Sequence, residues 1–193
     1  MCSSDLFEGN IFPVNPKYEM VAGVAAYPDI PSLPSAPDLG VIVTPPETVP
    51  TIIGQLGEKG TRAAVVISAG FIEGRSESGR ELQQAMLDAA KPYLLRIVGP
   101  NCLGVMAPGA FLNASFAHIH ALPGRLAFVA QSGAMIASVL DWATHRRIGF
   151  SHFVSLGDMA DVDFGDMLDY LAGDNRTRRS EERRVGKECR SRW

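Results

Sequence analysis

The chain has 193 residues, of which 46% are hydrophobic and 20% charged, and its formal net charge at pH 7 is −3. A mildly acidic chain lacks the basic surface of a nucleic-acid-binding protein, and no apolar run approaches the roughly 18 residues of a membrane-spanning helix. We therefore expect a cytoplasmic protein with no nucleic-acid partner and no membrane partner.

The two ends of the chain differ in kind from the rest. Residues 179–193 are highly charged without an apolar period and match what a common short-read sequencing adapter encodes in one frame, and residues 1–6 match the partner adapter. We expect both ends to be non-native, with a solvated basic tail as the alternative at the C-terminus. Without them the net charge is −5 and Cys102 is the single cysteine, so neither a disulfide framework nor a Cys-rich metal site can form.

Apolar runs alternate with helical patterns through the first 98 residues. Strands are expected at residues 10–14, 39–43, 63–67 and 95–98. A turn at Thr44-Pro45-Pro46-Glu47 leads into a helix that ends near Gly57 or Gly60, and the period of apolar residues predicts an amphipathic helix at 77–90. Strands separated by helices imply βαβ units and a parallel sheet that is covered on both faces.

A second unit repeats this order. A strand is expected at 126–129, a helix at 134–144 and a strand at 150–155. Asp161 or Asp163 can cap a further helix, which Gly173 ends. Two strands are too few for a stable sheet, so we expect this unit to be cut short.

Two short turns that contain glycine and suit phosphate binding follow strand ends in the middle of the chain. The first is Gly99-Pro100-Asn101-Cys102, and the second, Gln131-Ser132-Gly133, leads directly into a helix. Free N–H groups at a helix start and the helix dipole favour an anion there, and the Ser132 hydroxyl adds a donor. The alternative for this second turn is a plain serine helix cap.

Neither the lone cysteine nor the histidines provide a catalytic group. Cys102 has no base paired with it nearby in the sequence, so a packed thiol is preferred over a nucleophile. His118 and His120 form H-x-H, which binds a metal only if a third ligand joins it, and the remaining histidines, His145 and His152, suit surface or packing positions. We therefore predict no catalytic residue and no metal site.

Seven ordered motifs carry a resemblance to a known family. They are NPKYE, VIVTPPETVP, VVISAGF, IVGPNCLG, LNASFA, FVAQSGA and VSLGDMADVDFGDMLDYL. They resemble the NDP-forming acyl-CoA synthetases (ADP-forming acetate–CoA ligases), which are relatives of the succinyl-CoA synthetase α subunit. Within that family the resemblance is greatest to bacterial members fused to a GNAT domain, the protein lysine acetyltransferases.

The resemblance implies an α/β fold in two parts and a set of binding residues. Residues 7–120 would form a Rossmann-like CoA-binding domain whose first strand is missing, and residues 121–178 the start of a flavodoxin-like succinyl-CoA synthetase domain. The implied CoA-binding residues are Lys17, Thr44, Pro45, Pro46, Ser68, Ala69, Gly70, Asn101 and Cys102. The implied phosphate site is Gln131, Ser132 and Gly133, preceded by Ala130 where the family has serine. For Lys17 the alternative is a solvated side chain, and for the small loop residues it is tight packing between strand and helix.

The implied activity belongs to a larger parent protein. The parent would interconvert acyl-CoA, ADP and phosphate with free acid, CoA and ATP through a phosphohistidine that lies outside this chain, so the chain alone would be inactive. ATP, ADP and Mg²⁺ would bind to an ATP-grasp domain or β subunit, and a GNAT domain would add lysine acetylation. The alternatives are a CoA-sensing or acyl-CoA-sensing module of an acetyltransferase, and an NAD-dependent oxidoreductase of the same fold, which does not explain G-P-N-C or Q-S-G.

Overall fold

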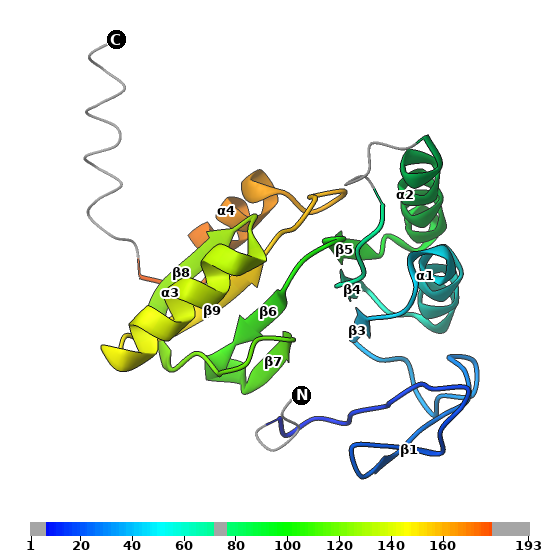
Figure 1. Cartoon of the computed structure of the whole chain (residues 1–193), viewed down its shortest axis with the longest axis horizontal. Helices are drawn as coiled ribbons and strands as arrows, with labels where there is room; N and C mark the ends of the chain where they lie inside the picture. Colours follow the sequence, from blue (N-terminus) through cyan, green and yellow to red (C-terminus); the bar gives the residue numbers. More distant parts are fainter. Residues whose placement is uncertain (1–6, 72–76, 179–193) are drawn as a thin grey trace.

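The computed structural model describes residues 7–71 and 77–178 (Figure 1). The segments 1–6 and 179–193, which we interpret as non-native, lie outside the described residues. The described chain forms a three-stranded sheet, a four-stranded sheet and a small two-stranded hairpin. None of its helices is long and apolar enough to span a membrane.

The first sheet is parallel, as predicted, with strand order β3-β4-β5. Its strands are β3 (Leu39–Ile42), β4 (Ala63–Val66) and β5 (Arg96–Val98), and the helices α1 (Val49–Lys59) and α2 (Glu77–Ala90) connect them. Gly60 follows the last residue of α1 as its C-terminal cap. Its φ of 104° is the left-handed conformation that favours glycine at a helix end.

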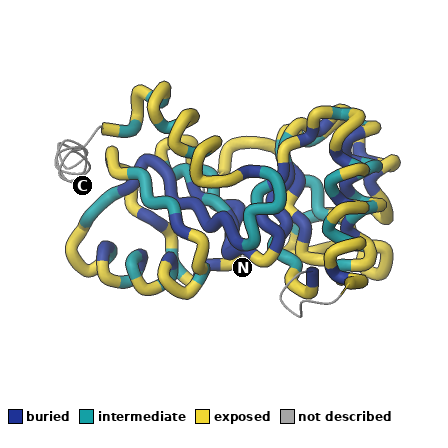
Figure 2. The backbone as a smooth tube through the Cα atoms, turned by 90° about the horizontal axis from the view of Figure 1, so that it is seen from above, coloured by how far each residue is buried: buried dark blue, intermediate teal, exposed yellow. Residues whose placement is uncertain are grey.

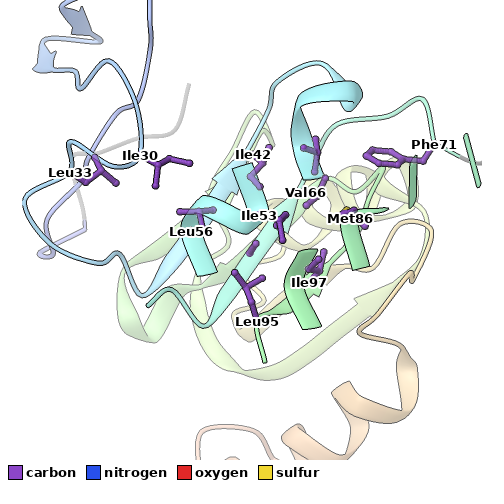
Figure 3. Packing of buried hydrophobic residues seen from close by; sticks show 13 residues of the cluster. Ile30, Leu33, Ile42, Ile53, Leu56, Val66, Phe71, Met86, Leu95 and Ile97 are labelled. Carbon is purple, nitrogen blue, oxygen red and sulfur yellow. The ribbon is translucent and has the colours of Figure 1, made fainter. Parts of the chain in front are cut away.

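The core of this half lies between the sheet and its two helices. Figure 3 shows Ile53 of α1 and Met86 of α2 turned toward Val66 and Ile97 of the strands, and all four are buried. The two helices pack against each other, so both cover the same face of the sheet. On the opposite face Val65 is buried but Val41 is 39% exposed, so the prediction of a sheet covered on both faces is only partly met.

The second sheet is mixed, with strand order β7-β6-β9-β8. Its strands are β6 (Gly104–Ala107), β7 (Leu112–Ser115), β8 (Pro123–Ala130) and β9 (Phe150–Ser155). The strands β8 and β9 are parallel, whereas β6 is antiparallel to both β7 and β9. Strands from both sides of residue 120 therefore build one sheet, and the boundary between residues 120 and 121 stays a prediction.

Local sequence patterns predicted neither β6 nor β7. Each has only four residues, rich in small side chains, and β6 pairs with β9, which lies more than 40 positions later in the chain. Short strands without a strong β-branched pattern form because they pair with other strands, and the sequence around them does not contain those partners. These two strands complete the sheet that two strands alone could not form.

Helices pack on both faces of the second sheet. Helix α3 (Gly133–His145) buries Leu140 beside Phe153, whereas α4 (Phe164–Gly173) places Met167 beside Val154. Successive residues of a strand point to opposite faces, and all six residues of β9 are buried. Figure 2 shows this buried interior beneath helices whose outer turns are exposed.

The two remaining helix and strand predictions had different outcomes. Asp163 is the cap of α4 and forms a capping box with Asp166, which confirms that alternative over Asp161. The prediction of a strand at 10–14 is wrong, because in this segment only Val14 makes an isolated β-bridge, to Tyr27. The hairpin in this region is formed instead by β1 (Met20–Val21) and β2 (Val24–Ala25).

Candidate functional site

Two of the predicted CoA-binding segments lie together at the carboxyl edge of the first sheet. Thr44-Pro45-Pro46 follows β3, and Ser68-Ala69-Gly70 follows β4. The Ser68 hydroxyl donates a hydrogen bond of 2.5 Å to the Thr44 carbonyl oxygen, and a Cβ on Gly70 would lie 3.1 Å from Pro46 Cγ. Adjacent parallel strands end at one edge, so these loops form one surface.

The loop after β5 packs against the end of β4 and joins this surface. The Asn101 N–H donates to the Ser68 carbonyl oxygen at 2.9 Å, and the Cys102 thiol donates to the Val66 carbonyl oxygen at 3.3 Å. Gly99 has a φ of 104°, and a Cβ there would overlap the Val66 carbonyl oxygen. Glycine is therefore needed at this close approach.

The predicted phosphate segment lies at the start of α3. Ser132 is the cap of this helix, and its hydroxyl accepts a hydrogen bond from the Met135 N–H at 3.4 Å. A Cβ on Gly133 would lie 3.3 Å from Leu103 Cβ, so the helix begins against the loop that contains Cys102. The start of α3 thus lies against the G-P-N-C loop.

A turn after β9 links these two loops, and the sequence analysis gave it no role. The Gly157 N–H donates to the Gln131 carbonyl oxygen at 3.2 Å, and the Asp158 N–H donates to the Pro100 carbonyl oxygen at 2.9 Å. The residues belong to the motif V-S-L-G-D-M, which carried the resemblance but no chemical signal of its own. Only the fold shows that the turn holds both loops.

The loops after β4 and β5, Phe116 and the start of α3 line an open pocket of about 490 Å³. The residues that line it come from four separate segments: Ile67, Ala69, Asn101, Cys102, Leu103, Phe116, Gly133, Ala134 and Ala137. Three predicted binding residues, Ala69, Asn101 and Cys102, thus line the same pocket as Gly133 of the predicted phosphate site. Phe116 belongs to the motif LNASFA, for which no binding role was predicted.

Lys17 is not among the residues that line this pocket. It lies in an exposed segment before β1, where its N–H donates to Asn15 Oδ1 at 2.9 Å. The structure therefore brings Ala69, Asn101 and Cys102 together with Gly133 at the pocket. The other predicted residues do not line it: Lys17, Thr44, Pro45, Pro46, Ser68, Gly70, Gln131 and Ser132. The contact of Lys17 with CoA stays a prediction.

Cys102 is packed beneath the pocket and is only 3% exposed. Burial raises the pKa of its thiol to about 12, and the negative charge of Asp158 acts in the same direction. A thiol with this pKa is protonated at neutral pH, whereas a nucleophile needs the thiolate. The structure agrees with the interpretation of a packed thiol.

The histidines lie away from the pocket. His118 is exposed and 2.9 Å from Asp141, and His120 contacts the Asn113 amide at 2.8 Å. His152 is buried in β9, and burial lowers the pKa of its imidazole, which favours the neutral form at pH 7. Among residues 7–71 and 77–178, no three histidine, cysteine or carboxylate side chains are grouped to hold a metal ion.

Known proteins resemble the chain in both of its parts. Residues 3–108 match the family model for a CoA binding domain, and residues 123–179 match that for a succinyl-CoA ligase like flavodoxin domain. The ADP-forming acetate–CoA ligase I of Archaeoglobus fulgidus is 42% identical over 171 residues, 89% of this chain and 25% of that protein. The α subunit of the ADP-forming acetate–CoA ligase II of Pyrococcus furiosus is 43% identical over 164 residues, 85% of this chain and 35% of the relative.

Solved structures resemble the described fold closely. A protein of Pyrococcus horikoshii OT3 has a TM-score of 0.81 and 41% identity, over 86% of this chain and 38% of its own. The dinucleotide-forming acetyl-coenzyme A synthetase 1 of Ca. Korarchaeum cryptofilum, in complex with phosphate and ADP, has a TM-score of 0.82 and 35% identity, over 89% of this chain and 36% of its own. The chain thus spans between about a quarter and two fifths of these relatives. It belongs to the CoA-binding domain family and carries, after that domain, a succinyl-CoA ligase like flavodoxin domain.

Proposed function

We propose that this chain is the CoA-binding part of an ADP-forming acyl-CoA ligase. The parent protein would interconvert acyl-CoA, ADP and phosphate with free acid, CoA and ATP. The observation that carries the proposal is the shared pocket, in which Asn101 and Cys102 of the first part lie beside the start of α3. Relatives named as ADP-forming acetate–CoA ligases support the ligase interpretation rather than the acetyltransferase alternative.

The loops of the first part and the start of α3 have distinct roles in this proposal. Thr44–Pro46, Ser68–Gly70 and Asn101-Cys102 would hold CoA through backbone groups that small residues leave accessible, and Lys17 would contact its nucleotide. Gln131-Ser132-Gly133 would hold phosphate, because first-turn N–H groups and the helix dipole favour an anion. Nucleotide and Mg²⁺ would bind to an ATP-grasp domain or β subunit, in keeping with a relative that is itself named an α subunit.

Calorimetric titration with CoA tests the first role. We expect saturable binding with one site per chain, and we expect Asn101→Ala to weaken it by about tenfold, since one or two hydrogen bonds to the ligand would be lost. Asn175→Ala is the matched control, because Asn175 is exposed and lies outside the pocket. Absence of CoA binding at millimolar concentration would contradict the proposed function.

Ser132→Ala tests the phosphate role. Loss of the helix cap is expected to cost about 1 kcal/mol, which lowers Tm by about 2 to 4 °C for a chain of this size. Phosphate at constant ionic strength should raise Tm of the unmodified chain but raise Tm of Ser132→Ala less. Ser138→Ala is the control on the same helix, since its hydroxyl only donates back to the Ala134 carbonyl oxygen. Equal phosphate effects in all three proteins would refute the site.

A further inference from the structure

The proposed reaction determines where the acyl group must lie. The reaction moves an acyl group from the sulfur of CoA toward a phosphate oxygen, so the acyl carbon has to reach both atoms. The proposed thiol end at Asn101-Cys102 and the proposed phosphate end at Gly133 line one pocket. That pocket therefore contains the acyl group, if the proposed function holds.

The pocket suits an uncharged acyl chain. The residues that line it within the described chain include no lysine, arginine, histidine, aspartate or glutamate, and most of them are small and apolar. A carboxylate at the far end of an acyl chain would find no cation here. Removal of a charge from water without a partner is costly, whereas each buried methylene favours binding.

A negative charge behind the pocket strengthens this preference. Asn101 Nδ2 donates to Asp158 Oδ1 at 3.3 Å, so a carboxylate contacts one of the residues that line the pocket. The charge of Asp158 also contributes to the raised pKa of the Cys102 thiol, so it acts at the floor of the pocket. Like charges repel each other, so a carboxylate at the end of an acyl chain in this pocket is disfavoured.

Phe116 provides the largest apolar surface at this site. It follows β7, and its N–H donates to the Leu103 carbonyl oxygen at 3.1 Å, which holds the residue beside the Cys102 loop. Its side chain lines the pocket and yet is 58% exposed. A ring that is fixed at its backbone but not covered by the protein can close over an apolar ligand.

We propose that Phe116 is a specificity-determining residue, which selects acyl groups with an apolar, uncharged end by packing its ring over them in this pocket. The inference rests on the proposed function, because it assumes that CoA binds with its thiol end toward Asn101-Cys102. It adds to that function a role for one residue: Phe116 discriminates against dicarboxylic acids of the same length.

Calorimetry with two matched ligands tests the substrate class. Butyryl-CoA and succinyl-CoA carry four-carbon acyl groups that differ in a terminal methyl or carboxylate. We expect butyryl-CoA to bind at least tenfold more tightly than CoA, since each buried methylene contributes about fourfold. Succinyl-CoA should bind at least tenfold more weakly than butyryl-CoA. Equal binding of the two acyl-CoA ligands would overturn the inference while leaving the proposed CoA site intact, whereas absence of CoA binding would overturn both.

Phe116→Ala tests the residue itself. We expect the advantage of butyryl-CoA over CoA, measured as the ratio of their dissociation constants, to fall to threefold or less in this variant. Phe111→Ala is the matched control, because Phe111 is 53% exposed, directly precedes the same strand β7 and does not line the pocket. Phe116→Leu should restore part of the advantage, since it restores apolar surface. An unchanged advantage in Phe116→Ala, or an equal loss in Phe111→Ala, would overturn the role of Phe116.

Discussion

Iodoacetamide is expected to modify Cys102 at least fiftyfold more slowly than an unstructured cysteine peptide at pH 7.5. Burial raises the pKa of the thiol from 9.0 to about 12, so the thiolate population falls by about a thousandfold. The more basic thiolate is a stronger nucleophile, which recovers about twentyfold, but only 3% of the residue is exposed and the reagent has little access. The modification is followed by mass spectrometry on the peptide that contains Cys102.

The pH dependence identifies the cause of this slow reaction. The rate should rise about tenfold per pH unit up to at least pH 10, whereas the rate of the peptide levels off near pH 9. The same chain in concentrated guanidinium chloride is the control and should react like the peptide. A rate that levels off near pH 9 in the folded chain would show an ordinary thiol and contradict the packed position.

The same pKa has a consequence for stability, with a defined sign. The folded chain keeps the thiol proton between about pH 9 and 12, whereas the unfolded chain loses it, so the free energy of unfolding falls as the pH rises through this window.

Bound CoA should slow the alkylation of Cys102 further if the thiol end of CoA lies beside Cys102. Equal rates with and without CoA would argue against that placement.

Gly157→Ala is expected to destabilise the chain by about 2 to 4 kcal/mol and to weaken CoA binding at least tenfold. Gly157 has a φ of 57°, and a Cβ there would overlap the Pro100 carbonyl oxygen and lie 2.6 Å from the Asn101 carbonyl oxygen. These are backbone atoms of the G-P-N-C loop, which cannot turn away as a flexible side chain does. The loop or the turn must move, and Asn101 moves with it.

Urea unfolding measures this effect. With an m-value of about 2 kcal/mol per molar, the midpoint should fall by about 1 to 2 M while m stays the same. Gly54→Ala is the matched control, because Gly54 lies within α1 and a Cβ there meets nothing within 4 Å. This control should be as stable as the unmodified chain or up to about 1 kcal/mol more stable. A midpoint of Gly157→Ala within 0.3 M of the unmodified chain would contradict the close contact.

Local sequence signals predicted the helices and the parallel strands well. The helix α2 has the predicted bounds, 77–90, and α3 differs from the predicted 134–144 by one residue at each end. Periodic apolar faces and caps such as Asp163 act within a few residues, so a single sequence window contains the information. The family motifs added the two-part fold, which the family models and the solved structures confirm.

Contacts across long separations in the chain were not predictable in this way. The strand β6 exists because it pairs with β9, and the pocket exists because loops after β4 and β5 meet Phe116 and the start of α3. Neither feature leaves a periodic pattern, because its contacts join residues that lie far apart in the chain. Lys17 shows the converse: a position in a family motif does not by itself place a side chain at the pocket.

The sequence by itself determined the class of fold, the helices and the parallel strands, and it predicted two loops as sites for a CoA thiol end and a phosphate. The tertiary structure alone decided that these loops share one pocket, that the turn at Gly157-Asp158 holds them together, and that Phe116 lies at the same site. The physical reason is the range of the interactions. Capping and amphipathic burial act between neighbours in the sequence, whereas a pocket is made by side chains that only the packing of two sheets brings together.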